Sequence, residues 1–261
     1  MKRAIRLVLW VGVLALGIAP RAVAQTSVTL TAPPPGFAYD NIYMSPYYAT
    51  VGGVANTPVI CDDFGDDSSK STWTATLTSF TGLTAPTNTS WALAGGTLAQ
   101  YNAVAYLTLQ VLNQAYGSTG QVMYSFADWA VFDPTGVAKY LTSYPITGGT
   151  LTTANLCNDI FGSGAFNATT KVCTAAIGGL VGTAYAAPVP NGGYQMEILS
   201  PTTGSNPLTV CKAETGCAAQ EFIAMVPEGG AATAYLVLAG LCCFGAMFLR
   251  SRRQTGTITA A

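Results

Sequence analysis

The chain has 261 residues, of which 50% are hydrophobic and 9% are charged, and it contains no histidine. This length fits one domain of ordinary size with targeting segments at its ends, and the lack of histidine excludes Ser-His-Asp and Cys-His catalysis and histidine metal sites. Between residues 25 and 226, four lysines stand against eleven carboxylates, a net charge near −7. That charge argues against nucleic acid as a partner, because phosphate binding needs a cationic surface.

Residues 1–24 have the composition of a secretory signal peptide. A basic start precedes the apolar run at residues 7–19, and Ala22 and Ala24 then supply the small residues at positions −3 and −1 before Gln25. We therefore expect export through the secretion translocase, with signal peptidase cutting after Ala24. Export would place the rest of the chain in an oxidising compartment, where disulfides persist.

Alternating and β-branched segments predict strands near both ends of the exported residues. Residues 26–60 contain such segments, broken by proline and glycine turns. Residues 71–80 alternate strictly and place Trp73, Ala75 and Leu77 on one side, which is typical of a half-buried strand. Two final strands are expected at residues 194–200 and 221–225.

In the middle of the chain the spacing of apolar residues changes to that of a helix. Residues 98–115 have apolar positions at broadly helical spacing and contain no Gly or Pro, and Gly117 follows them. A second helix is expected at about residues 122–132, with Asp133-Pro134 as its stop. Residues 171–187 are a weaker helix candidate, poor in charge and rich in Ala and Gly.

The C-terminal part combines three short segments in a fixed order. Val226, Pro227, Glu228, Gly229 and Gly230 are followed by nineteen uncharged residues at 231–249, and then by a basic cluster. As a helix the uncharged run would be about 28 Å long at ~1.5 Å per residue, which matches the hydrocarbon core of a bilayer. The sequence therefore predicts one transmembrane helix, with the basic cluster on the cytoplasmic side. That cluster consists of Arg250, Arg252 and Arg253.

This order of a Val-Pro-Glu motif, an apolar helix and a basic cluster resembles the PEP-CTERM sorting signal over residues 226–253. The usual motif continues Pro-Glu-Pro, and Gly229 stands here in place of the second proline. The resemblance implies processing near Pro227-Glu228 by exosortase, a membrane transpeptidase of bacteria with an outer membrane. It further implies the inner membrane as an intermediate location, then the cell surface or the extracellular space, with extracellular polysaccharide or biofilm as the setting.

A second resemblance covers about residues 40–226. The motifs C-D-D-F at 61–64, F-A-D-W-A-V-F-D-P at 126–134 and Q-E-F-I at 220–223 are similar to those of a globular domain common among sorted PEP-CTERM proteins. That family has no known reaction, so the resemblance implies a surface protein that is not an enzyme, with no catalytic residue and no cofactor.

These observations predict an α+β fold, in which a β-rich extracellular domain carries two or three short helices. An N-terminal signal peptide and the C-terminal transmembrane helix complete the fold class. The expected organisation is a signal peptide at 1–24, an exported domain at 25–225, the sorting signal at 226–253 and a short tail at 254–261. The sorting signal divides into a motif at 226–230, a helix at 231–249 and a basic cluster at 250–253.

Acidic residues gather around Gly65, at Asp62, Asp63, Asp66 and Asp67. Oxygen-rich acidic loops can hold Ca²⁺, but this spacing does not match a D-x-D-x-D-G loop. A solvated acidic turn is the preferred interpretation, so no metal site is predicted. Paired carboxylates for glycoside hydrolysis need two groups facing one cleft, and the sequence does not show such a pair.

Five cysteines lie outside the two ends, an odd number that leaves one without a disulfide if the others pair. Proximity pairs Cys157 with Cys173 and Cys211 with Cys217, and connectivity stays open because spacing alone cannot prove it. The leftover cysteine is Cys61, for which we expect a buried thiol.

Two alternatives to the sorted surface protein are kept. One is a plain single-pass membrane protein with a periplasmic domain. The other is a thioester adhesin, in which a Cys in a similar motif bonds a Gln that precedes an A-I-W-like segment. In that alignment Ser125 takes the place of the Gln and cannot supply the acyl group, while Gln121 lies one helical turn earlier, about 6 Å away along the axis.

Overall fold

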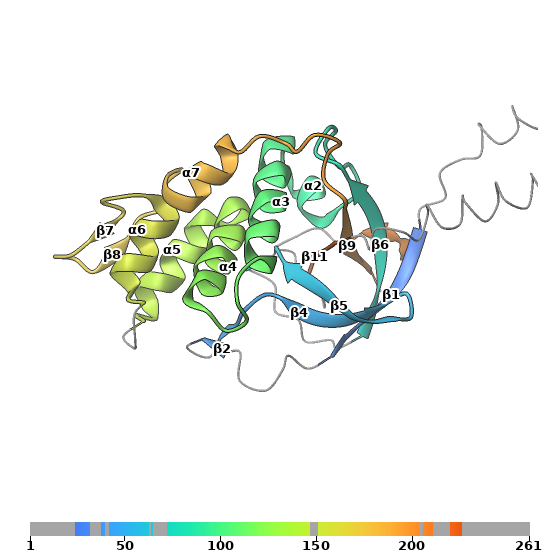
Figure 1. The fold of residues 1–261 in the computed structure, drawn as a ribbon, viewed down its shortest axis with the longest axis horizontal. Coiled ribbons are helices and arrows are strands. Elements are labelled where there is room, and N and C mark those ends of the chain that lie inside the picture. The colour runs from blue at the N-terminus through green and yellow to red at the C-terminus, as the bar shows by residue number, and fades with distance from the viewer. Residues whose placement is uncertain are drawn as a thin grey trace, which may run out of the picture. The chain divides into compact units, whose positions relative to one another are not determined.

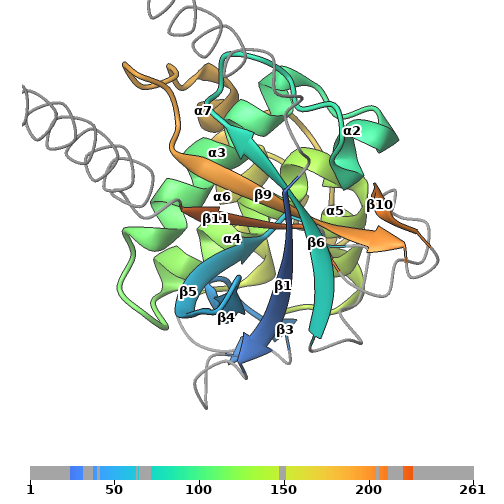
Figure 2. The ribbon, with the colours of Figure 1, turned by 90° about the vertical axis from the view of Figure 1, so that its right-hand side faces the viewer.

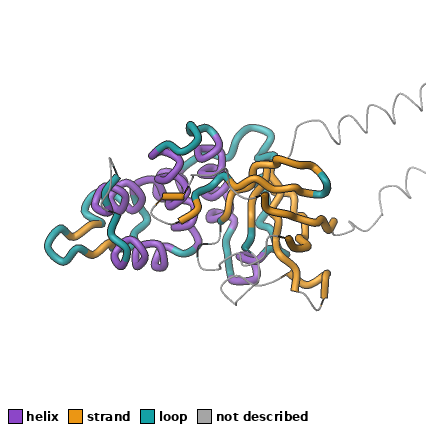
Figure 3. The backbone as a smooth tube through the Cα atoms, turned by 90° about the horizontal axis from the view of Figure 1, so that it is seen from below, coloured by secondary structure: helices purple, strands orange, loops and turns teal. Residues whose placement is uncertain are grey.

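The structure is a computed structural model that describes residues 24–31, 38–39, 42–62, 64, 72–146, 151–203, 206–210 and 220–225. The chain divides into two units, Met1–Met225 and Val226–Ala261, and every described residue belongs to the first. Within that unit the long strands gather at one end and most of the helices lie at the other, together with a short hairpin (Figure 3).

Six antiparallel strands close into a β-barrel. Their order is β6-β1-β4-β5-β11-β9, and β9 pairs with β6 to complete the ring. A seventh strand, β10 (Asn206–Val210), pairs with Thr202 and Thr203 at the end of β9. The barrel strands are β1 (Ala24–Thr31), β4 (Tyr47–Val51), β5 (Val54–Cys61), β6 (Thr72–Phe80), β9 (Met196–Thr203) and β11 (Phe222–Met225). Figure 2 views the barrel with the helices behind it.

The barrel interior is filled by alternate residues of these strands. Val28 of β1 is opposite Val51 on one side and Trp73 on the other, so one face of β1 points inward throughout. Because side chains of a strand alternate between its two faces, the remaining residues point outward. The interior cluster comprises Val28, Ala49, Val59, Cys61, Trp73, Ala75, Leu199, Phe222 and Ala224.

The helices form a second layer against the outer face of the barrel (Figure 1). Met196, Ile198 and Ile223 belong to the same buried cluster as the helices. This places β9 and β11 between two cores, one on each face. The helices are α2 (Ser90–Ala94), α3 (Leu98–Leu112), α4 (Thr119–Phe132), α5 (Pro134–Ser143), α6 (Thr153–Phe161) and α7 (Gly179–Ala186).

Side-chain caps begin five of these six helices. Thr97 and Gln100 form a capping box at α3, and Ser118 accepts a hydrogen bond from the Gln121 amide at α4. Asp133 caps α5, with Pro134 at the first helical position. Proline suits that position because its missing N–H has no partner there in any helix. Asp133-Pro134 therefore ends α4 and also begins the next helix.

The expected fold class is wrong in several respects. The strands form a closed barrel, and the described residues contain six helices in place of two or three. Among the described residues no helix is long and apolar enough to cross a membrane. The predicted signal peptide up to residue 23 and the predicted transmembrane helix at 231–249 lie outside the described residues.

The predicted helix at 171–187 is also wrong in its first half. Phe166–Asn167 (β7) and Val172–Cys173 (β8) form a two-stranded hairpin. Lys171 in its turn has φ 62°, a left-handed conformation that a right-handed helix does not allow. Only residues 179–186 become helical. Residues 38–39 (β2) and 42–43 (β3) form another two-stranded antiparallel sheet, between β1 and β4 in the sequence.

Candidate functional site

The three motifs at 61–64, 126–134 and 220–223 meet at the junction between barrel and helices. Cys61 at the end of β5 is the register partner of Phe222 in β11. From α4, the indole Nε1 of Trp129 donates a hydrogen bond to the Cys61 carbonyl, at 2.8 Å. The Phe64 ring lies against Trp129, with centroids 5.2 Å apart. Segments separated by more than sixty residues thus form one contact region.

A row of buried polar side chains crosses the outer face of the barrel at this junction. The antiparallel register pairs Phe222 with Cys61 on one side and with Leu199 on the other. One residue further along, Glu221 therefore lies between Asp62 and Ser200, with all three pointing away from the barrel interior. Thr76 of β6, the register partner of Ser200, extends the row. Each of the four is at most 1% exposed.

Glu221 is the centre of this row. Its Oε2 accepts hydrogen bonds from the Ser200 hydroxyl and from the Ser90 backbone N–H, each at 2.5 Å. Its Oε1 accepts from the Tyr101 hydroxyl at 3.5 Å. The Asp62 carboxyl lies beside it by the strand register and lowers the pKa of Glu221. Four polar groups, from the end of β5 and from β9, α2 and α3, thus converge on this one side chain.

Helices α2 and α3 cover the row of polar side chains on the outer face of the barrel. The Thr89 side chain caps α2 and hydrogen-bonds the Tyr101 hydroxyl. The Ala92 amide donates to both Thr89 Oγ1 and Tyr101 Oη, at 3.2 and 3.0 Å. Because Thr89 and Tyr101 are both 0% exposed, this cover is sealed from solvent.

The environment favours the protonated form of this acid pair. Burial raises the pKa of Glu221 above its usual range, and the hydrogen bonds from Ser200, Ser90 and Asp62 offset that only in part. Burial, together with the charges of Glu221 and Asp62, raises the pKa of Tyr101 far above its usual value. Two carboxyls in one dry site do not both ionise readily, so the proximity of Asp62 disfavours a doubly charged pair.

No family model, curated protein or solved structure matches this chain.

The interpretation of Asp62 as part of a solvated acidic turn is wrong, since Asp62 is 0% exposed. Asp63, Asp66 and Asp67 lie outside the described residues. In the part of the chain that the structure describes, no cluster of three or more His, Cys, Asp or Glu side chains could hold a metal ion. The sequence contains one hint of the acid pair: Asp62 and Glu221 are each flanked by a residue with a strong preference for burial, Cys61 and Phe222.

The structure places Cys61 away from the groups that a thioester would need. The Cys61 side chain belongs to the barrel interior with Trp73 and Phe222, whereas α4 packs in the helical core. Gln121 uses its Oε1 to accept a hydrogen bond from the Gly117 amide at 2.9 Å. Ser125 is buried with its hydroxyl 3.5 Å from the Ser45 carbonyl. The observed packing therefore gives no support to the thioester alternative.

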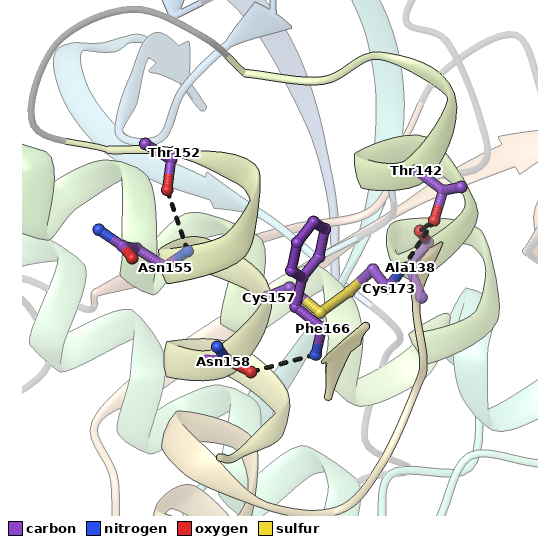
Figure 4. The surroundings of a disulfide bond; sticks show 8 residues. All are labelled: Ala138, Thr142, Thr152, Asn155, Cys157, Asn158, Phe166 and Cys173. Carbon is purple, nitrogen blue, oxygen red and sulfur yellow. Dashed lines mark hydrogen bonds between the residues drawn. A yellow bond between two sulfur atoms is a disulfide. The ribbon is translucent and has the colours of Figure 1, made fainter. Parts of the chain in front are cut away.

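The structure joins Cys157 and Cys173 by a disulfide, the pairing that proximity predicts (Figure 4). Their Cα atoms are 5.9 Å apart, within the usual range. The bridge connects α6 to the β7–β8 hairpin. Cys211 and Cys217 lie outside the described residues, as do the motif at 226–230 and the arginines at 250, 252 and 253.

A second buried acid, Asp128, lies on α4 among apolar neighbours. It is 0% exposed, and neither carboxyl oxygen has a hydrogen-bond partner among the described residues. Burial alone raises the pKa of Asp128 well above its usual range. An unpaired charge in such a place is costly, so the native state keeps this carboxyl protonated.

We expect the substitution Asp128→Asn to remove a loss of stability at high pH. The pKa of Asp128 is higher in the folded chain than in the unfolded chain. Its contribution to the free energy of unfolding is therefore full at low pH and is lost as the pH rises. The variant should match the parent near pH 4 and exceed it by about 1–3 kcal/mol near pH 9. Urea unfolding of the full chain across this pH range measures the difference.

Asp159→Asn is the matched control, because Asp159 is exposed on α6. It should leave the pH dependence of stability unchanged. Equal pH profiles for Asp128→Asn and the parent would show that Asp128 is ionised in the native state, contrary to this account.

Proposed function

We propose that this chain is the precursor of an exported bacterial protein of the cell surface or extracellular matrix, sorted by exosortase through its C-terminal signal. On this proposal the chain is exported through the secretion translocase, and signal peptidase removes residues 1–24. The chain is then held in the inner membrane by its C-terminal helix. Exosortase then acts at the motif 226–230. Extracellular polysaccharide is the proposed surrounding of the mature domain.

The observation that best supports export is the disulfide between Cys157 and Cys173. Structural disulfides persist in exported proteins and are rare in the reducing cytosol. The bridge is an integral part of the helical layer, since Cys157 is 0% and Cys173 5% exposed. A fold that buries a disulfide in its core suits an oxidising compartment.

The strand boundaries are compatible with both cleavages. The barrel begins at Ala24, and Gln25 already pairs with Thr76 of β6. The barrel ends at Met225 in β11, one residue before Val226. Cutting after Ala24 and beyond Val226 would thus leave all the barrel strands with at most one terminal residue removed. The mature domain could keep its fold after processing.

We expect surface material to begin at Gln25 and to lack every peptide from Leu236 onward. The full chain would be produced in a bacterium that has an exosortase and in the same strain without that enzyme, followed by mass spectrometry of surface proteins. An N-terminal glutamine can cyclise with loss of ammonia, so both masses of the first peptide are searched. Without exosortase the tail should remain.

Glu228→Ala should block processing in the strain that has exosortase, because it removes the central acid of the motif. Thr257→Ala, in the tail beyond the basic cluster, is the matched control and should be processed normally. An intact tail on the parent protein in the presence of active exosortase would leave only the plain anchor. A first residue at Met1 would overturn export by signal-peptide cleavage.

A further inference from the structure

We propose that Asp62 and Glu221 form a proton-dependent latch that holds strand β11 in the barrel. When the pair shares a proton, it connects β5 to β11 through a carboxyl–carboxyl hydrogen bond. When both groups are ionised, two like charges face each other in a dry site, and β11 is pushed away from its neighbours.

The geometry makes β11 the strand that ionisation of the pair should destabilise most. It has only four residues, Phe222–Met225, and it lies between β5 and β9. Glu221 is the residue immediately before it; its carboxyl accepts a hydrogen bond from Ser200 on β9 and lies beside Asp62 at the end of β5. Charging this side chain therefore acts directly before the first residue of a short strand.

Among the described residues, the groups that hydrogen-bond Glu221 carry no positive charge. From β9 the contact is the Ser200 hydroxyl, from α2 the Ser90 amide, and from α3 the Tyr101 hydroxyl. The two described lysines, Lys139 on α5 and Lys171 in the β7–β8 turn, are exposed and do not contribute to the pKa shift of Glu221.

The effects of two other carboxyls on stability must be distinguished from the effect of the latch. Glu197 on β9 is the register partner of Ala224 in β11, and partial burial raises its pKa. Asp128 on α4 has its pKa raised by burial alone, without a charge contribution from the pair. Both groups weaken the fold as the pH rises, so a global stability measurement cannot single out the pair. The test therefore needs a local readout at β11.

Amide hydrogen exchange of residues 222–225 in the full chain, measured from pH 5 to pH 9, provides that readout. After correction for the intrinsic rise of exchange with pH, the opening constant of β11 should increase by up to about tenfold per pH unit above the pKa of the pair. Amides in the middle of α3 should show a smaller increase over the same range.

Glu221→Gln cannot ionise and retains hydrogen-bonding atoms, so it should flatten this pH dependence. Asp62→Asn should reduce it without abolishing it, since Glu221 would lose the like charge beside it but would still be buried. Glu197→Gln is the matched comparison and should reduce the slope at β11 less than either pair variant, because it leaves the like charges of the pair in place. If Glu221→Gln does not fold, the parent profile together with Asp62→Asn decides the matter. A pH-independent β11 in the parent, or an unchanged slope in the pair variants, overturns the latch.

The latch does not depend on the proposed sorting. One consequence does: because β11 ends directly before Val226, its release would also loosen the attachment of the proposed motif to the barrel. Exosortase processing that rises with pH in the parent and not in Glu221→Gln would support this link. Constant processing alongside a pH-dependent β11 would reject the link and leave the latch standing.

Discussion

Replacing Trp129 with alanine is expected to lower the free energy of unfolding by about 3–5 kcal/mol, the range for large aromatic residues removed from a core. Trp129 is 2% exposed and packs against Phe64 and Phe126, with ring centroids 5.2 Å away in each case. It also donates the hydrogen bond that satisfies the Cys61 carbonyl. The side chain thus connects the helical layer to the end of β5. Urea unfolding followed by circular dichroism measures the change.

Two milder substitutions separate the hydrogen bond from the packing. Trp129→Phe removes the indole N–H and leaves a buried carbonyl without its donor, at an expected cost of about 1–3 kcal/mol. Trp73→Phe is the matched control, because Trp73 is also buried but its Nε1 has no hydrogen-bond partner among the described residues. Trp73→Phe should cost less than Trp129→Phe. Equal losses would show that the bond to Cys61 contributes nothing measurable.

Removing the disulfide by the double substitution Cys157→Ala and Cys173→Ala is expected to cost about 2–5 kcal/mol. The bridge closes a loop with a sequence separation of 16, for which the chain-entropy model gives about 3 kcal/mol. Since the bridge also ties the β7–β8 hairpin to α6, its loss should raise exchange of the hairpin amides most. The parent and the variant, both made under oxidising conditions, are compared by urea unfolding.

Local hydrogen bonds limit how far the hairpin can separate when the bridge is absent. The Asn158 side chain accepts from the Phe166 amide at 3.1 Å, and the Thr142 hydroxyl accepts from the Cys173 amide at 3.0 Å (Figure 4). The Cys61→Ala variant serves as the control and should keep the disulfide-linked peptide of the parent in a non-reducing digest. A double variant as stable as the parent would show that these hydrogen bonds alone hold the hairpin.

The buried acids set an unusual pH response for this fold. In most proteins carboxylates are stabilised as ions, and acid unfolds the chain by protonating them. Here burial raises the pKa of Glu221, Asp128 and Glu197, so each of them favours the folded state at low pH and disfavours it as the pH rises. Together they should make the described domain more tolerant of acid than of alkali.

Elements with a local sequence pattern could be predicted from the sequence. The alternation at residues 71–80 corresponds to β6, where Trp73 and Ala75 are buried in the barrel interior. The period at 98–115 corresponds to α3, and that at 122–132 lies within α4. Such patterns succeed because the exposure of a side chain repeats every two residues in a strand and every 3.6 in a helix.

The barrel and the acid pair depend on contacts between residues far apart in the chain. Closure depends on the pairing of β6 with β9, which aligns Thr76 with Ser200 across more than a hundred residues. Nothing in a short window specifies such a register, because it follows from packing on both faces of the sheet. The sequence predicted a solvated turn at Asp62 and a strand at Glu221, with nothing to bring the two together. They form a buried pair because β5 and β11 are neighbours in the barrel and α2 and α3 exclude water from the row.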